Sequence, residues 1–256
     1  LRGNIMKTEQ IVLNLLVFDQ ARKAGMQQLA MLHHVVDLGI GAAEIRREYF
    51  DDVTAEIAGI ASYAKAHQLQ LFYSVPDELF VNQQLNPKLT QYYDEAQAMG
   101  VTAIKFNIGD FVAFSQSDVS ELKQLLARGI QTNIENDQTL VSGRLMPIQR
   151  FMVGVQQSGL DVGYVYDMGN WRYVNEDEVA AAQQLSHVVR YIHVKDDQGV
   201  AETLKTVPLG EGEIQWQNIL QLLPSNVPVA IEYPTQDDTV IKRGIDDLLN
   251  YEAHQS

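Results

Sequence analysis

The chain contains no cysteine in its 256 residues. Disulfides and thiolate metal ligands are therefore excluded, and any bound metal must rely on oxygen and nitrogen donors. Basic residues are also scarce, because 19 Lys and Arg stand against 33 Asp and Glu and the formal net charge is −14. Proteins that bind the phosphate backbone need a basic surface, so no nucleic-acid partner is expected.

Long apolar runs are missing as well. No stretch approaches the roughly 20 apolar residues that cross a bilayer, so no membrane partner is expected. The start of the chain, LRGNIMKTEQ, lacks the apolar core and the cleavage site of a secretory signal. These absences make the cytoplasm the expected location. Met6 is the expected initiator, which would make residues 1–5 a leader or a cloning remnant.

Apolar, β-branched runs alternate along the chain with longer segments of helical periodicity, a pattern typical of parallel strands joined by crossover helices. Strands are predicted at residues 10–18, 41–46, 69–75, 101–108, 131–136, 162–168, 189–195 and 227–233. Helices are predicted at residues 21–38, 52–67, 87–99, 117–127, 216–223 and 239–251, after Pro147, and from Asn175. Eight such units predict an α/β fold, a single (β/α)8 TIM barrel that forms one domain over residues 6–256. An open doubly wound sheet is the alternative, but no G-x-G-x-x-G opens a helix after a strand.

Four polar side chains stand at the ends of the last four predicted strands: Glu135, Asp167, His193 and Glu232. Their spacings of 32, 26 and 39 residues are those of strand–helix units. In a closed barrel the ends of the strands meet at one mouth, so we expect these groups to converge there. Three carboxylates and one imidazole form a set of ligands for one divalent metal ion. Mn²⁺ is favoured, with Mg²⁺, Co²⁺ or Zn²⁺ as alternatives.

Several of these segments resemble a known family. They are EIRRE around Glu44 and Arg46, IEN with Glu135, YDMGN with Asp167, HVKD with His193, GEGEIQW, and AIEY with Glu232. In this order and spacing they resemble the xylose isomerase-like sugar or sugar-phosphate isomerase/epimerase barrels, from the second strand to the eighth.

The resemblance implies a metal held by Glu135, Asp167, His193 and Glu232, with the first and last as acid/base groups across a sugar or keto-polyol substrate. Many relatives carry a histidine three residues after the aspartate, where this chain has Asn170. Homo-oligomers are frequent among such barrels, and the sequence shows no interface of its own.

Isomerisation or epimerisation of a ketose removes a proton next to a carbonyl and produces an enediolate, whose charge a divalent ion offsets. We expect Glu135 and Glu232 to move the proton. Lys195, which shares strand parity with His193, is expected to stabilise the enediolate, to bind a phosphate, or to pair with Asp196. The expected substrate-binding residues are Arg46, Glu44, Asn170 and Glu211. Lys105 points into or out of the barrel depending on a register that the sequence leaves open.

Three other functions compete with this one. A metal-dependent dehydratase or lyase for keto-polyols would begin with the same proton abstraction. An endonuclease IV-like repair enzyme would need several metals and histidines on the second and third strands, where this chain has none. A barrel that binds ligands without turnover is the third alternative.

Overall fold

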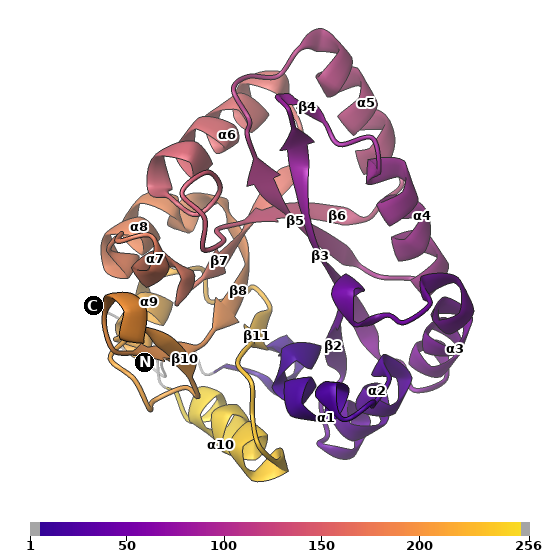
Figure 1. The fold of residues 1–256 in the computed structure, drawn as a ribbon, viewed down its shortest axis with the longest axis vertical. Coiled ribbons are helices and arrows are strands. Elements are labelled where there is room, and N and C mark those ends of the chain that lie inside the picture. The colour runs from indigo at the N-terminus through magenta and orange to yellow at the C-terminus, as the bar shows by residue number, and fades with distance from the viewer. Residues whose placement is uncertain (1–5, 252–256) are drawn as a thin grey trace.

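Eight parallel strands close into a barrel in the computed structural model, which describes residues 6–251 (Figure 1). Each barrel strand pairs with its neighbour along the chain, and β1 pairs with β11 to close the ring. The barrel strands are β1 (Ile11–Asn14), β2 (Ala42–Arg46), β3 (Gln70–Val81), β5 (Ala103–Gly109), β6 (Gln131–Glu135), β7 (Val162–Asp167), β8 (Val189–Val194) and β11 (Val229–Ile231). This topology confirms the predicted (β/α)8 TIM barrel. The expectation about residues 1–5 concerns a segment outside the described residues.

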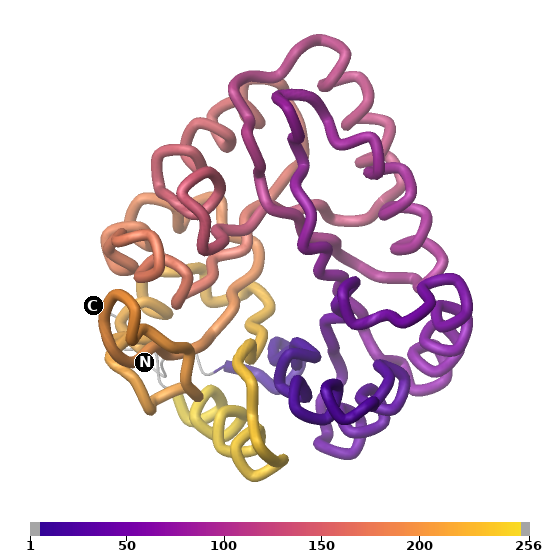
Figure 2. The backbone as a smooth tube through the Cα atoms, viewed as in Figure 1, coloured from indigo at the N-terminus to yellow at the C-terminus, as the bar shows by residue number. Residues whose placement is uncertain are grey.

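Helices surround the barrel, and the chain passes around the ring in order from its first strand to its last (Figure 2). They are α1 (Asp19–Lys23), α2 (Gln28–Asp37), α3 (Val53–Ala66), α4 (Leu89–Met99), α5 (Gln116–Leu126), α6 (Leu145–Ser158), α7 (Asn170–Tyr173), α8 (Glu178–Leu185), α9 (Trp216–Leu222) and α10 (Asp238–Leu249). Within residues 6–251, no helix has the length and apolar character needed to cross a membrane.

Three short strands lie outside the barrel ring. β4 (Gln84–Leu85) pairs antiparallel with the far end of β3. β9 (Asp196–Gln198) and β10 (Lys205–Val207) form an antiparallel pair directly after β8. This pair begins the long loop that follows the seventh barrel strand.

The core has two layers, one between the strands and the helices and one inside the barrel. A large cluster of aliphatic and aromatic residues packs between the strands and the helices. A small separate cluster consists of Val12, Ala42, Phe72, Ala103, Val165, Tyr191 and Ala230. Strand residues two positions apart share a face, so the residues that follow these by two also face the interior. They are all polar: Asn14, Glu44, Ser74, Lys105, Asp167, His193 and Glu232.

Two predicted elements in the first unit are shorter than expected. The predicted strand at residues 10–18 ends at Asn14, whose side-chain oxygen accepts a hydrogen bond from the Leu16 backbone N–H at 2.9 Å and caps a 3-10 helix. The predicted helix at residues 21–38 is split into α1 and α2. Gly25 lies in the break with φ +99°, a conformation that ends a helix and suits glycine.

Other element boundaries also differ from the prediction. β3 does not stop before Pro76 but continues to Val81, with a register shift between Ser74 and Glu78. Proline lacks an N–H, and an irregular ladder tolerates that loss. The helix predicted from Asn175 begins instead at Glu178, because the Asp177 side chain caps it through the Ala180 N–H.

Candidate metal centre at the mouth of the barrel

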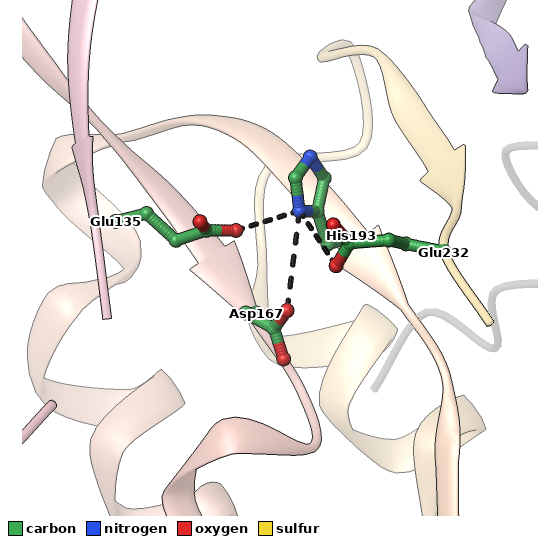
Figure 3. A group of neighbouring side chains, drawn as sticks. All are labelled: Glu135, Asp167, His193 and Glu232. Carbon is green, nitrogen blue, oxygen red and sulfur yellow. Dashed lines mark ion pairs between the residues drawn. The ribbon is translucent and has the colours of Figure 1, made fainter. Parts of the chain in front are cut away.

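Glu135, Asp167, His193 and Glu232 lie together at the carboxyl ends of their strands (Figure 3). His193 Nδ1 is 2.6 Å from Glu135 Oε1, 3.1 Å from Glu232 Oε2 and 3.9 Å from Asp167 Oδ2. One ligand atom from each residue lies within 4.8 Å of the other three. Four donors this close together are within reach of one divalent ion.

Three of these four atoms are buried and form no well-aligned hydrogen bond: Glu135 Oε1, Asp167 Oδ2 and His193 Nδ1. Their close contacts with one another and with Lys195 are ion pairs instead. Buried polar atoms are nearly always hydrogen-bonded, and an unmet one costs about 1–3 kcal/mol. Three such atoms pointing at one spot fit a coordinated cation, and the oxygen and nitrogen donors match a divalent ion.

The electrostatics of the cluster also favour an added cation. Burial raises the pKa of Asp167 to about 7, with Glu232 and Glu135 adding to the rise and Lys195 and His193 opposing it. Burial opposes the charged form of His193, yet Glu232 and other carboxylates around the ring raise its pKa well above the usual value. Asp167 is therefore the carboxylate of this cluster whose ionised form is opposed, and positive charge beside it would favour that form.

Glu44 fixes the orientation of the His193 ring from below. Its Oε2 lies 2.8 Å from His193 Nε2 and also accepts a hydrogen bond from the Tyr191 hydroxyl. All three side chains are buried in the barrel. When this carboxylate accepts a hydrogen bond from Nε2–H, Nδ1 is the ring nitrogen that faces the acidic cluster. Glu44, expected to bind substrate, thus lies beneath the histidine.

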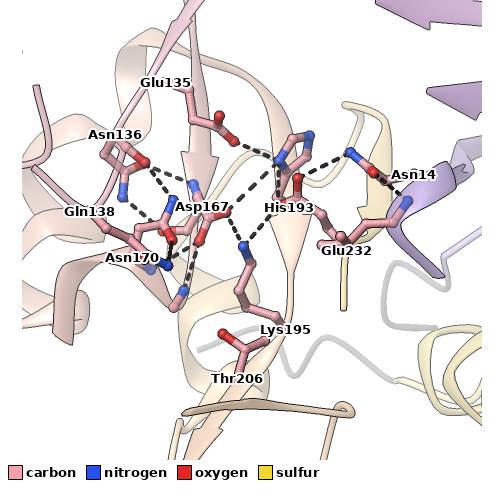
Figure 4. Close-up of polar contacts among 12 residues, drawn as sticks. Asn14, Glu135, Asn136, Gln138, Asp167, Asn170, His193, Lys195, Thr206 and Glu232 are labelled. Atoms are coloured by element: carbon pink, nitrogen blue, oxygen red, sulfur yellow. Dashed lines mark hydrogen bonds and ion pairs between the residues drawn. The ribbon is translucent and has the colours of Figure 1, made fainter. Parts of the chain in front are cut away.

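A hydrogen-bonded clamp holds Asp167 (Figure 4). The Asn136 side chain accepts from the Asp167 backbone N–H and donates to the Asp167 carbonyl, both at 3.0 Å, and accepts from the Tyr164 hydroxyl. Asp167 Oδ1 in turn accepts the backbone N–H groups of Gly169 and Asn170. One oxygen of the carboxylate is thus saturated by the chain, and the other, Oδ2, faces the cluster.

Three cations border the carboxylates. Lys195 Nζ lies 2.6 Å from Asp167 Oδ2 and 2.8 Å from Glu232 Oε2. Arg46 Nη1 lies 3.0 Å from Glu232 Oε1. Lys105 Nζ forms an ion pair with Glu135 Oε2. Burial raises the pKa of Glu135, but Lys105 and His193 outweigh it and lower that pKa to about 2.

An open cavity of about 310 Å³ lies above this cluster. Its lining includes Glu135 and Glu232 but neither Asp167 nor His193. The complete lining is Leu16, Arg46, Ser74, Pro76, Lys105, Asn107, Glu135, Asp137, Gln138, Asn170, Lys195 and Glu232. The two glutamates are therefore open to a ligand, whereas the aspartate and the histidine lie behind them.

Two expected substrate-binding residues occupy different surroundings. Asn170 lines the cavity, but its side chain is engaged: Nδ2 donates to the Asn136 carbonyl at 2.8 Å, and Oδ1 accepts from Gln138 at 3.1 Å. Glu211 does not line the cavity. It lies on the exposed loop after β10, where it forms an ion pair with Arg243 on α10.

Asp196 and Asp197 follow Lys195 and have different partners. The buried Asp196 carboxylate accepts the backbone N–H groups of Gly210, Gly212 and Ile214 at 2.8–3.1 Å. Asp197 Oδ2 is buried without a hydrogen-bond partner, and burial raises the pKa of Asp197 to about 6 against the opposing charge of Lys195. Neither aspartate forms an ion pair with Lys195, the alternative that the sequence left open for Asp196.

Sequence reasoning left Lys105 undecided and did not single out Asn14. Asn14 Nδ2 donates to Glu232 Oε1 at 3.1 Å, so it helps to orient that glutamate. The signal for Lys105 was present in its strand. Ile104, Phe106 and Ile108 pack outward in the large core, which leaves Lys105 on the inner face.

Larger hollows exist on the outer surface, away from these groups. One of about 540 Å³ lies between α6 and α8 and is lined by apolar residues, glutamines, His187 and Arg190. None of its lining residues is a carboxylate. Of these two cavities, the one at the mouth of the barrel is the one that carboxylates line.

Solved structures with the same architecture match nearly the whole chain, and their descriptions name xylose isomerase domains or xylose isomerase-like TIM barrels. The chain has the xylose isomerase-like barrel fold. No family model matches the sequence, and no curated protein matches it.

Three further structures with this fold have different names. The IOLI protein, solved with a bound zinc atom, is 13% identical, with a TM-score of 0.71 over 96% of this chain and 100% of its own. The probable 3-DHS dehydratase AsbF from Bacillus anthracis is 15% identical, with a TM-score of 0.69 over 94% and 99%. An L-ribulose 3-epimerase is 13% identical, with a TM-score of 0.63 over 95% and 91%. Such identities establish a common fold and leave the reaction of this chain open.

Proposed function

We propose that the protein is a divalent-metal-dependent isomerase or epimerase of sugars or sugar derivatives, acting by proton transfer through an enediolate. One observation carries the proposal. Ligand atoms of Glu135, Asp167, His193 and Glu232 converge within 4.8 Å under a cavity, and three of them form no well-aligned hydrogen bond. The epimerase and the zinc-bound barrel among the neighbours of this fold support the same chemistry.

In this proposal the four residues hold the ion, and Mn²⁺ is the favoured metal because three hard carboxylates outnumber one imidazole. When bound, a divalent ion supplies positive charge that offsets the charge developing on the substrate oxygens during proton removal. The low pKa of Glu135 keeps its carboxylate ionised at neutral pH, the form that can bind a cation.

The division of labour follows from exposure to the cavity. Glu135 and Glu232 line the cavity. Each has one carboxylate oxygen that faces the acidic cluster and one that pairs with a basic residue of the cavity wall, Lys105 for Glu135 and Arg46 for Glu232. A substrate carbon held between them can lose a proton to one carboxylate and regain one from the other, which inverts the centre. Lys195, with its ammonium group between Asp167 and Glu232, is positioned to stabilise the enediolate oxygen.

The experiment is solvent exchange. The metal-loaded protein is incubated in D₂O with a panel of ketoses, keto-polyols and keto acids, and deuterium incorporation is followed by mass spectrometry and NMR. We expect exchange at a carbon next to the carbonyl without net loss of water. Glu135→Gln should abolish it, and His193→Ala should weaken metal retention.

Glu95→Gln is the matched control. This buried glutamate holds Arg47 and Tyr73 on the helix side of the barrel and does not line the cavity. It should keep exchange and metal content. Unchanged turnover in Glu135→Gln together with unchanged metal content in His193→Ala would refute the mechanism.

A dehydratase acting on a keto-polyol is the second candidate. The observation that favours it is the Lys195 ammonium group at the cavity wall, which can protonate a departing β-hydroxyl after the same first step. A probable dehydratase is also among the neighbours of the fold. In the exchange experiment this function would appear as an unsaturated product 18 mass units below the substrate.

A further inference from the structure

The barrel mouth has a second, cationic wall. Arg46 on β2 is the register partner of Ser74 on β3, and Ser74 is the register partner of Lys105 on β5. Register partners on neighbouring parallel strands lie side by side, about 4.8 Å apart, and point the same way. All three line the cavity. The four proposed metal ligands come from the other side of the ring, on β6, β7 and β8 and at the residue after β11.

This wall has hydrogen-bond donors that the described residues leave unused. The Ser74 hydroxyl is buried, with 1% of the residue exposed, and has no hydrogen-bond partner. Lys105 Nζ carries three N–H bonds, and its one partner in the described chain is Glu135. Arg46 donates to Asn14, Glu48 and Glu232, which fixes its guanidinium in place. A hydroxyl and an ammonium group beside a fixed guanidinium suit an anionic oxygen ligand.

In the described part of the chain, two sets of backbone donors at places where TIM barrels commonly bind phosphate are already occupied. TIM barrels frequently bind phosphate with backbone N–H groups in the loops after the seventh and eighth strands. After β8, the N–H groups of Gly210, Gly212 and Ile214 already surround the Asp196 carboxylate. After β11, the N-terminus of α10 is capped by Asp237 through two backbone N–H groups. The chain's own carboxylates occupy both sets of donors.

We infer that the substrate is an unphosphorylated keto-polyol carrying a free carboxylate, a sugar keto acid, whose carboxylate binds Ser74 and Lys105 beside Arg46. The inference rests on the proposed function, because it places the reacting carbonyl and hydroxyl oxygens over the acidic cluster on the opposite wall. The cavity of about 310 Å³ holds both ends of such a molecule.

The test uses three polyols that share one chain and differ only at C1: D-gluconate, D-glucitol and D-glucitol 1-phosphate. Binding to the Mn²⁺-loaded protein is measured by calorimetry at constant ionic strength. D-gluconate should bind about tenfold or more tightly than D-glucitol, since a charge-assisted hydrogen bond is stronger than a neutral one. D-glucitol 1-phosphate should gain nothing over D-glucitol.

The variants assign the effect to the wall. Ser74→Ala should weaken D-gluconate binding about tenfold and leave D-glucitol binding unchanged, because it removes a donor to the carboxylate. Lys105→Met should weaken D-gluconate binding about tenfold more than it weakens D-glucitol binding. Ser74→Ala removes a hydroxyl without a partner, so its folding is not at risk. Lys123→Met on the exposed side of α5 is the matched control and should bind D-gluconate as the wild type does.

Three results would overturn the inference: equal affinity for D-gluconate and D-glucitol, tightest binding of the phosphorylated polyol, or a preference for D-gluconate that survives in both wall variants. The two proposals fail separately. If no compound exchanges deuterium but D-gluconate is preferred, the proposed reaction is wrong and the carboxylate site stands. If only neutral or phosphorylated ketoses exchange, the reaction stands and the carboxylate site is wrong.

Discussion

Replacing Asn136 with alanine tests how the barrel positions the proposed metal ligand Asp167. The Asn136 side chain is fully buried and makes three hydrogen bonds, two to the Asp167 backbone and one from the Tyr164 hydroxyl. It therefore ties the end of β6 to the end of β7. Alanine would leave two donors and one acceptor without partners in the barrel interior.

The expected cost follows from counting those groups. Each buried polar group left without a partner costs about 1–3 kcal/mol, and some relaxation or water entry keeps the values low, so Asn136→Ala should lose about 3 kcal/mol of unfolding free energy. Asp167 would also lose the tether that aims Oδ2 at the cluster. Loss of a group that orients a metal ligand typically lowers metal affinity about 10–100-fold.

The assay pairs urea unfolding with calorimetric titration of the metal-free protein by Mn²⁺. Tyr164→Phe is the control, because it removes only the hydroxyl and keeps both hydrogen bonds between the Asn136 side chain and the Asp167 backbone. It should lose about 1 kcal/mol of stability and retain the wild-type metal affinity.

Two results would refute the reasoning. A loss below about 0.5 kcal/mol in Asn136→Ala would mean that the three hydrogen bonds do not hold the strand ends together. A variant that is destabilised as expected but binds Mn²⁺ with wild-type affinity would mean that Asp167 is not positioned by this clamp or is not a ligand.

Three further predictions concern stability and the long loop. The pKa of Asp197 is raised to about 6, so its contribution to stability is full below about pH 4 and is lost as the pH rises through 6. In urea unfolding, Asp197→Asn should therefore be about 2 kcal/mol more stable than the wild type at pH 7.5 and nearly equal to it at pH 4. Equal stability of the two proteins at both pH values would contradict this. The ring centroid of Phe80 lies 4.9 Å from that of Phe111 and 6.5 Å from that of Phe151. Phe80→Ala should lower the free energy of unfolding by about 3–5 kcal/mol, and a loss under about 1 kcal/mol would show that this aromatic cluster is loosely packed. Asp196→Ala should speed amide hydrogen exchange at residues 210–214, and unchanged protection would mean that the loop is held by other contacts.

The sequence predicted the fold because its two periodicities were strong. Strand-like runs followed by helical segments recur eight times, and the closed parallel barrel agrees with that count. Boundaries were predicted less well where a side chain interacts with its own backbone. Asn14 is the last residue of β1, before the predicted end of the strand, and α8 begins after Asp177, later than predicted. Both boundaries depend on the geometry of a side-chain cap, which the residue type alone does not determine.

Within the site, Glu135, Asp167, His193 and Glu232 were recognisable because each is a polar residue closing an apolar strand. Glu44 and Glu211 were harder to place. Glu44 shares a face with Arg46 but lies one layer deeper, where it meets His193. Glu211 is close in sequence to the site yet pairs with Arg243 on α10, since the path of a long loop depends on its anchors.

The alternation of residues along each strand determined by itself that a polar layer would lie above an apolar floor inside the barrel. It also determined which residue types could meet there. Only closure of the ring decided which atoms face one another, because the stagger between strands sets the height and the angle of every side chain around the axis. The pairing of Lys105 with Glu135, the support of His193 by Glu44, and the row formed by Arg46, Ser74 and Lys105 all arise from that stagger.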